Sequence, residues 1–248
     1  MKLLAWIALS VLSFPVLSLP PRYTDLLDFV QEAPDQADTK TCLYVASTGA
    51  IELLANKKNG VRNPGPGDKY DLSESFTINA PVHTKGKYWW ETPVRKYNRG
   101  FGIHISDWPF EPWNGTDVSN VPWNNRPWQN LPKVQVPNVD TIPLFVFGNK
   151  WSTNVLNSSH VEKIKDALVK YESPVMINYN DMGYWHVILI VGYDDELPGR
   201  CHELTTEQCG ERKGAFYVRD SFGVPVELRD YDWYRVKGNA AFVVKEKP

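Results

Sequence analysis

The sequence predicts an α+β fold of two lobes, in which helices come first and strands follow. Apolar residues recur at helical spacing over 42–58 and again over 161–171. Shorter, nearly continuous apolar runs of strand length come mostly later in the chain. We expect a helical lobe over about 36–150 and a β-rich lobe over about 151–248. The expected strands cover 175–179, 186–193, 215–220 and 240–244.

The N-terminal segment has the pattern of a secretory signal peptide over 1–18. Lys2 precedes an apolar run over 3–17, and a small residue, Ser18, stands before the expected cut. The run is short for a membrane span and a proline interrupts it, so an N-terminal membrane anchor is the weaker alternative. We therefore expect a single domain over 19–248 that is secreted, or held in a lysosome-like or periplasmic compartment, depending on the host.

Charge and composition exclude some partners. The formal net charge is −2, and the sequence has no block of basic residues, so nucleic acid is not expected as a partner. The hydrophobic fraction of 42% is ordinary for a globular protein. No later stretch is long and apolar enough to cross a bilayer. We therefore expect no membrane contact after signal cleavage.

One of the three cysteines, Cys42, lies where a polar loop becomes an apolar helix. Asp38, Thr39 and Thr41 favour a helix start at this point. Unpaired N–H groups and the helix dipole stabilise a thiolate in a first helical turn. Gln36, six residues earlier, can direct a side-chain N–H to the same place, as an oxyanion-hole donor does. The alternative is that Cys42 is a small core residue.

The segments around this helix are expected to be less regular. Residues 19–34 are expected to run extended, with a short amphipathic piece over 23–30. The helix should end at Asn59-Gly60, before a loop over 61–70. Residues 71–150 should form short helices and ordered loops rich in tryptophan and proline. We expect these rings mainly to fill the core and line clefts, and the weaker alternative is that exposed rings form a carbohydrate-binding surface.

Two polar residues mark the ends of expected strands. His186 begins an apolar strand within YWHVILIVGYDD (184–195), and Asp220 ends another within FYVRDSFG (216–223). A carboxylate can accept from an imidazole N–H and fix its tautomer beside a nucleophile. Taken separately, a lone His or a lone Asp at the end of a strand is more often a structural residue than a catalytic one.

Several stretches together resemble the papain family of cysteine peptidases. In that family the mature domain begins with a Gln, and the nucleophilic Cys that opens the central helix follows six residues later, as Gln36 and Cys42 are spaced here. The resemblance covers nearly all of 30–245 and is weakest over 77–150. The helix continues similarly with Ala46, Ser47, Ala50, Ile51 and Glu52, and the later matching stretches are YDLSESF (70–76), VEKIKDALVKYESPVMINY (161–179), HVILIVGYDD (186–195), GAFYVRDSFG (214–223) and DYDWYRV (230–236).

The resemblance implies a papain-like peptidase with its active site in the cleft between the lobes. Cys42 is the expected nucleophile, His186 the general base and acid, and Gln36 the oxyanion donor. Asp220 stands where the family has the orienting Asn. The expected reaction is hydrolysis of a polypeptide through an acyl-enzyme on Cys42, and no cofactor is required.

The chain also departs from the family pattern. Leu43 replaces the Trp after the nucleophile, Phe222 replaces the Trp that shields the orienting residue, and Thr39 replaces a disulfide-forming cysteine. The usual inhibitory propeptide is not expected. An Asp at the orienting position also occurs in Cys-His-Asp peptidases related to bacteriocin-processing enzymes, which share the fold. The alternative function is a weakly active or inactive secreted binding protein that uses the Trp-rich middle segment.

Cys201 and Cys209 flank a charged insertion between the expected His and Asp strands. In a secreted chain such a pair favours a disulfide, and a zinc site that includes His202 is the alternative. Asn114 and Asn157 begin Asn-X-Ser/Thr triplets and are possible glycosylation sites in a eukaryotic host. The remaining histidines, His83, His104 and His160, are expected to be structural or on the surface.

Overall fold

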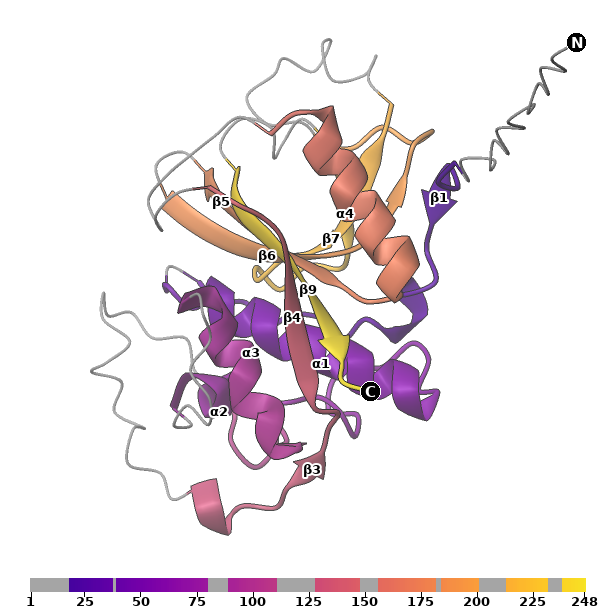
Figure 1. Cartoon of the computed structure of the whole chain (residues 1–248). Coiled ribbons are helices and arrows are strands. Elements are labelled where there is room, and N and C mark those ends of the chain that lie inside the picture. The colour runs from indigo at the N-terminus through magenta and orange to yellow at the C-terminus, as the bar shows by residue number, and fades with distance from the viewer. Residues whose placement is uncertain are drawn as a thin grey trace, which may run out of the picture.

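The α+β prediction is confirmed. In the computed structural model, small helices and a long central helix occupy one half of the molecule, and an antiparallel sheet forms the other half (Figure 1). No helix among the described residues is long and apolar enough to span a bilayer. The structure describes residues 18–37, 39–79, 89–110, 128–147, 156–181, 184–200, 213–231 and 238–248.

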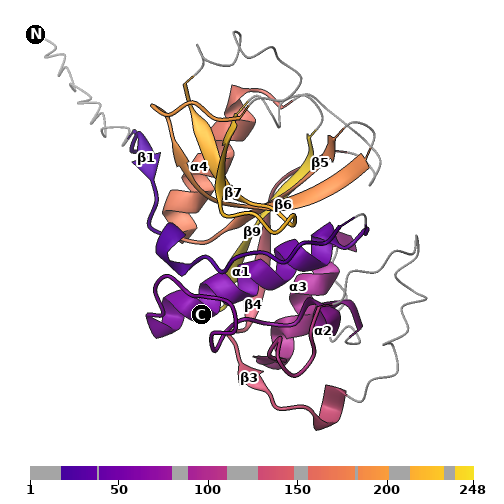
Figure 2. The same cartoon turned by 180° about the vertical axis from the view of Figure 1, so that it is seen from behind.

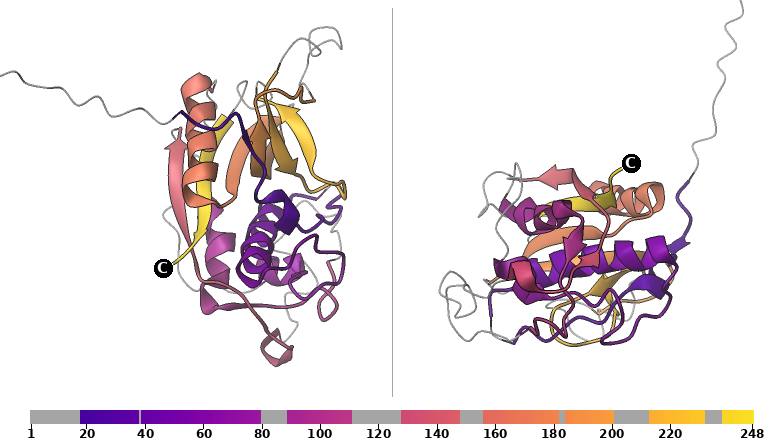
Figure 3. Two further views of the ribbon diagram at one scale, coloured as in Figure 1. Left: turned by 90° about the vertical axis from the view of Figure 1, so that its right-hand side faces the viewer. Right: turned by 90° about the horizontal axis from the view of Figure 1, so that it is seen from below.

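The central helix α1 (Cys42–Asn59) begins at the predicted cysteine. It ends at Gly60, whose φ of 68° is left-handed and whose N–H bonds to the carbonyl of Lys57 at 3.2 Å. Every residue from 42 to 56 except Tyr44 is buried. A helix that is buried on all sides must lie between other elements. Accordingly, α1 packs against the sheet on one side and small helices on another, and it crosses the width of the molecule (Figure 3).

The small helices pack against α1 in the lower half of the molecule (Figure 2). They are α2 (Glu74–Asn79) and α3 (Thr92–Lys96), accompanied by single 3-10 turns. A short antiparallel pair, β2 (Phe101–Gly102) and β3 (Val134–Gln135), also belongs to this lobe. The 3-10 turns cover Leu27–Phe29, Trp89–Glu91, Tyr97–Arg99 and Trp128–Asn130.

The aromatic side chains described in this lobe belong largely to its core. Trp90 and Trp108 are buried. Trp128 packs edge-to-face on Phe76, with 5.8 Å between ring centroids, and contacts Phe101 at 6.1 Å. These rings favour the core alternative over an aromatic binding surface for the described part of the segment.

In the part of the chain that the structure describes, the second lobe contains a seven-stranded sheet. Six of its strands follow the order β4-β9-β5-β6-β7-β8, and the seventh, β1, pairs with β6. Helix α4 (Ser158–Tyr171) packs against this sheet (Figure 1). Strand β6 packs against α1, and Arg219 at the end of β7 bonds to α1, so residues far apart in sequence meet there. The strands are β4 (Val139–Val146), β5 (Val175–Asp181), β6 (Tyr184–Asp194), β7 (Ala215–Arg219), β8 (Glu227–Asp230) and β9 (Gly238–Glu246).

Several strand predictions need correction. Strand β6 begins at Tyr184, so His186 is its third residue and not its first, and β7 ends one residue before Asp220. Strand β4 pairs with β9 in the large sheet, although the sequence places residues up to about 150 in the helical lobe. Its proline, Pro143, hides the strand pattern, but an edge strand tolerates a proline because one side needs no ladder bond.

The N-terminal strap, which we define as residues 22–36, connects the lobes. The predicted amphipathic piece is instead strand β1 (Arg22–Tyr23) followed by a 3-10 turn. Tyr23 pairs with Tyr193 of β6, and a Cβ on Gly192 would lie 2.5 Å from the Tyr23 carbonyl oxygen. Further on, the Asn56 side chain of α1 donates to the carbonyl of Phe29 at 3.2 Å. The strap therefore contacts the sheet at one end and α1 beyond it.

A buried arginine, Arg219, links β7 to α1. Its guanidinium donates to the carbonyl oxygens of Gln31 (2.7 Å) and Val45 (3.1 Å) and to the Glu52 carboxylate (3.1 Å). The side chains of Arg219 and Glu52 are 2% and 1% exposed, so their ion pair is buried. A Cβ on Gly49 would lie 2.1 Å from Arg219 Nη1. A side chain at position 49 would therefore have to displace the guanidinium from its present contacts.

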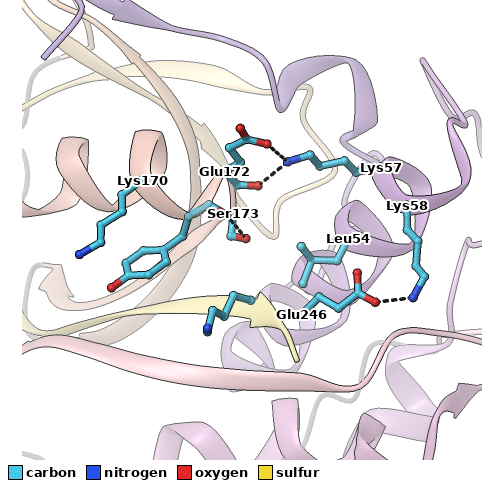
Figure 4. Close-up of a pocket in the computed structure, with 9 residues that line it drawn as sticks. Leu54, Lys57, Lys58, Lys170, Glu172, Ser173 and Glu246 are labelled. Carbon is cyan, nitrogen blue, oxygen red and sulfur yellow. Dashed lines mark hydrogen bonds and ion pairs between the residues drawn. The ribbon is translucent and has the colours of Figure 1, made fainter. Parts of the chain in front are cut away.

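Two surface ion pairs connect the lobes at the opposite end of α1. Lys57 Nζ lies 2.9 Å from a Glu172 carboxylate oxygen, and Lys58 pairs with Glu246 of β9 (Figure 4). Glu172 also ends α4 with a left-handed φ of 46°. These side chains line a pocket between α1, the α4–β5 turn and β9. Exposed pairs of this kind stabilise by about 0–1 kcal/mol each, so the buried Arg219 pair is the stronger link.

We predict that Gly49→Ala destabilises the protein despite the higher helix propensity of alanine. Alanine favours a helix by about 1 kcal/mol over glycine, whereas breaking a buried ion pair costs about 3–5 kcal/mol. The new methyl group must displace the Arg219 guanidinium, so the free energy of unfolding should fall by about 2–4 kcal/mol. Urea unfolding measures this change.

The matched control is Gly65→Ala, because a Cβ there has nothing nearer than 3.9 Å. Its stability should change by less than about 1 kcal/mol. A Gly49→Ala protein as stable as the parent would show that the Arg219 contacts do not constrain α1.

Candidate active site

Cys42 lies at the start of α1, as predicted. The N-cap residue Thr41 makes no side-chain capping bond, and its hydroxyl instead pairs with the Thr39 hydroxyl at 2.6 Å. The positive end of the helix is therefore not occupied by a capping oxygen and acts on the Cys42 sulfur. Cys42 is a free cysteine and is 8% exposed.

His186 and Asp220 are in direct contact. His186 Nε2 lies 2.6 Å from Asp220 Oδ1, and both residues are buried. The same oxygen accepts the backbone N–H of Ser221 at 2.6 Å. Because Asp220 uses Nε2, Nδ1 is the ring nitrogen left for Cys42, whose side chain also interacts with His186. The structure therefore brings together the three residues that the sequence places on α1, on β6 and after β7.

The charges of this group reinforce one another. Burial lowers the pKa of His186, but hydrogen bonds and charge interactions with Asp220 and Cys42 outweigh it and raise the pKa to about 10. Burial opposes ionisation of Asp220 as well, yet its bond to His186, the charges of His186 and Arg229 and the Ser221 N–H bring its pKa well below the ordinary value. At neutral pH the site therefore holds an imidazolium beside a carboxylate.

Gln36 is held beside the Asp220 segment. Its backbone N–H donates to the carbonyl of Ser221 at 2.8 Å, and its buried side-chain Nε2 donates to the carbonyl of Thr39 at 3.0 Å. An amide nitrogen has two N–H bonds, and no second acceptor contacts this one within the described ranges. Ala37 has a left-handed φ of 49°, a backbone strain of about 1–3 kcal/mol. The loop before Cys42 is therefore fixed in an unusual conformation.

Phe222 covers one face of His186. The two rings are stacked, with centroids 5.4 Å apart and planes 21° apart, while Phe222 is 49% exposed. The ring thus shields the imidazole from water on one side. Phe222 stands at the position where the resemblance to the papain family places the tryptophan that shields the orienting residue.

Two residues of this region were not predicted from the sequence. Arg229 of β8 pairs with Asp220 Oδ2, and its Nη1 donates to the Tyr179 hydroxyl at 3.0 Å. Tyr179 also lies edge-on to His186, with 5.7 Å between centroids. Strand pairing brings these residues together, and no local spacing in the sequence indicates it.

The other predicted sites are tested less directly. Cys201, Cys209 and Asn114 lie outside the described residues, so their disulfide and glycosylation assignments stay predictions. Asn157 is exposed, and its side-chain oxygen caps α4 by accepting the His160 N–H at 3.2 Å. Within the described ranges, no group of three His, Cys, Asp or Glu residues could hold a metal ion.

Comparison with known proteins identifies the fold. No protein-family profile matches the sequence, and no curated protein matches it significantly. Among solved structures, the chain is similar to the bromelain protease from Ananas comosus in complex with the E64 inhibitor, with a TM-score of 0.56 and 13% identity, covering 92% of this chain and 100% of that chain.

Two further similar structures are a digestive procathepsin L 3 of Tenebrio molitor and xylellain, a cysteine protease from Xylella fastidiosa. The procathepsin has a TM-score of 0.55 and 15% identity, covering 92% of this chain and 70% of that chain. Xylellain has a TM-score of 0.54 and 15% identity, covering 93% of this chain and 88% of that chain. The chain therefore has the papain-like cysteine protease fold.

We predict that His186 titrates above the ordinary histidine pKa of 6.5 even without the thiol. In Cys42→Ser the pKa should fall below about 10 but stay above 6.5, because Asp220 still stabilises the imidazolium. Adding Asp220→Asn should bring it to 6.5 or lower, because burial then acts alone. NMR titration of the ring measures these values.

The raised pKa of His186 also makes the stability of the fold depend on pH. Because the pKa of His186 is higher in the folded than in the unfolded protein, protonation of this ring stabilises the fold fully below pH 6.5, and the stabilisation is lost as the pH rises through about 10. A ring that titrates at or below 6.5 in Cys42→Ser would rule out an ionic pair with Asp220.

Proposed function

We propose that this protein, with its papain-like fold, is a cysteine peptidase that hydrolyses polypeptides. The observation that supports this most directly is the interaction of one buried imidazole, His186, with both Cys42 and Asp220. A nucleophile, a base and a group that orients the base are the requirements of acyl transfer through a covalent intermediate. A similar fold alone would not assign this activity.

In the proposed acylation step, the Cys42 thiolate attacks the carbonyl carbon of the scissile peptide bond. The carbonyl oxygen becomes an oxyanion, which Gln36 Nε2–H and the Cys42 backbone N–H stabilise. The tetrahedral intermediate collapses when the His186 imidazolium gives its proton to the leaving amine. A thioester on Cys42 and a neutral imidazole result.

In the proposed deacylation step, neutral His186 takes a proton from water, and the hydroxide attacks the thioester carbon. The carboxylic acid product leaves, and the sulfur departs as thiolate while His186 is again an imidazolium. Asp220 keeps the same ring nitrogen occupied in both steps, so the other nitrogen stays directed at the reacting atoms. No cofactor is required by this cycle.

We further propose that the peptidase is secreted and acts on polypeptides outside the cytosol. The signal-peptide pattern over 1–18 supports this location. The expected disulfide between Cys201 and Cys209 fits the same location, because disulfides form and persist in oxidising compartments.

We predict that iodoacetamide alkylates Cys42 much faster than it does glutathione at pH 6, because the sulfur lies in the first turn of α1 and interacts with His186, an environment typical of reactive cysteines. Peptide mapping locates the label. Purified protein should also cleave members of a fluorogenic peptide library, and Cys42→Ser should abolish cleavage with little change in melting temperature.

Two outcomes would count against the peptidase assignment. Cleavage that survives Cys42→Ser would exclude this nucleophile. Slow alkylation together with no cleavage would favour the alternative, a binding protein on the same fold.

We predict that Gln36→Ala lowers kcat by about 10²–10³-fold, the usual effect of losing an oxyanion-hole donor. KM should change less, because the donor acts mainly once charge develops. Steady-state kinetics on the best library peptide separate the two constants.

The matched control for this change is Gln31→Ala. Gln31 is also buried, and its Nε2 donates to the carbonyl of Gly65 at 2.9 Å. Both substitutions remove one side chain–backbone bond, but Gln31→Ala should leave kcat unchanged. Equal kcat values in the two variants would remove Gln36 from the oxyanion site.

A further inference from the structure

Four neighbouring strands of the sheet each contribute to a closed set of contacts, which we call the four-strand ring. Its members are Tyr179 of β5, His186 of β6, Asp220 directly after β7 and Arg229 of β8. Tyr179 and His186 are paired in register, and their rings meet edge-to-face at 5.7 Å. His186 bonds to Asp220 at 2.6 Å, Asp220 pairs with Arg229, and Arg229 donates to Tyr179 at 3.0 Å. The contacts thus return to the residue from which they start.

The two oxygens of Asp220 have separate partners within this ring. Oδ1 contacts His186 Nε2 and the Ser221 N–H, whereas Oδ2 contacts the Arg229 guanidinium. A carboxylate that pairs through one oxygen with a fixed cation cannot turn without breaking that pair. Arg229 therefore fixes the orientation of the Asp220 carboxylate relative to the imidazole.

The four-strand ring also supplies a cation to a buried carboxylate, which a neutral asparagine at position 220 would not need. A buried carboxylate without a partner is costly, and Asp220 is 2% exposed. His186 is a cation in only part of the proposed cycle, because it gives up its proton during acylation. Arg229 is charged at every pH of interest and is itself buried at 4% exposure. It therefore keeps Asp220 ionised when the imidazole is neutral.

We infer that Arg229 is a positioning residue that acts through Asp220, and that Asp220 and Arg229 together replace a single neutral orienting residue. Tyr179 supports the pair by accepting from Arg229 and by limiting rotation of the His186 ring. The consequence for catalysis rests on the proposed function, but the consequence for ring geometry and ionisation does not.

Arg229→Met should raise the pKa of Asp220, because one of the charges that keep it low is lost. The acid limb of the Cys42 alkylation rate should then move to higher pH, because Asp220 ionises at a higher pH and stabilises the imidazolium only above it. The other groups that face this site and must be held constant are His186, Cys42, Tyr179, the Ser221 N–H and Glu227, which pairs with Arg229.

A further variant is the charge-neutral double substitution Asp220→Asn with Arg229→Met. Asp220→Asn alone leaves Arg229 beside the imidazole without its carboxylate partner, so it should also slow alkylation. In the double variant neither charge is buried, and an asparagine carbonyl can still accept from His186. We expect the double variant to be alkylated faster than either single variant. Because Asp220 and Arg229 are in direct contact, their losses should not add in either role, so the acid limb of Arg229→Met, which a purely structural role would leave unchanged, decides between the two roles.

Two controls separate the contributions of charge and fold. Arg229→Lys keeps the charge but not the planar fork, so its acid limb should stay near that of the parent even if its rate falls. Arg62→Met removes an arginine that pairs with Asp28 on the surface, with 65% of the Arg62 side chain exposed, and should leave both rate and limb unchanged. Circular dichroism of each protein verifies folding before the rates are compared.

The experiment tests Arg229 even if the protein cleaves no peptide, because alkylation of Cys42 and NMR titration of His186 need no substrate. The inference is overturned if folded Arg229→Met keeps the parent acid limb, or if the double variant loses as much as the two single losses combined. If Arg229→Met does not fold, an acid limb of Arg229→Lys that moves as far as that of Asp220→Asn overturns it as well. Loss of cleavage with normal alkylation in the parent would count against the peptidase proposal alone.

Discussion

The buried guanidinium of Arg219 is the contact on which the position of the candidate site depends. Helix α1 carries Cys42 at its start, and Glu52, the acidic partner of Arg219, three turns further along. Arg219 immediately precedes Asp220, so each contact that fixes the arginine against α1 also fixes the carboxylate relative to the thiol. The link has an energetic cost, because burial raises the pKa of Glu52 to about 7 while Arg219 acts in the opposite direction. Gly49 is the sequence feature that makes the approach possible.

Charge in this protein is buried in pairs that join separate elements. Arg219 with Glu52 joins β7 to α1, and Arg229 with Asp220 joins β8 to the end of β7. Buried pairs of this kind add little net stability over well-packed apolar residues, but removing one partner is costly. Their contribution is therefore mainly geometric. These pairs restrict how the strands can lie relative to α1. A site that needs the side chains of Cys42, His186 and Asp220 in contact depends on that restriction.

Local signals predicted part of this structure, and long-range pairing decided the rest. The start of α1 at Cys42 was predicted from residues that favour N-caps, although Thr41 makes no side-chain capping bond, and its end was predicted from Asn59-Gly60. The apolar cores of β5, β6, β7 and β9 were predicted from their composition. The proximity of Cys42, His186 and Asp220 followed from resemblance, and their catalytic roles stay predictions. Strand β4 was missed because Pro143 lies within it. Arg229 was missed because it reaches the site through register across several strands, which no local spacing encodes.

The place of β9 in the sheet has a consequence for biosynthesis. This strand comes last in sequence order, yet it lies between β4 and β5 and pairs with both. A ribosome that adds about 5–20 residues per second therefore releases β4 and β5 well before their shared neighbour exists. Until residues 238–246 emerge, both strands present unpaired edges, which are templates for aggregation. A nascent chain of this protein should consequently depend on chaperones until that segment has emerged, and β4 and β5 should join the same sheet only then.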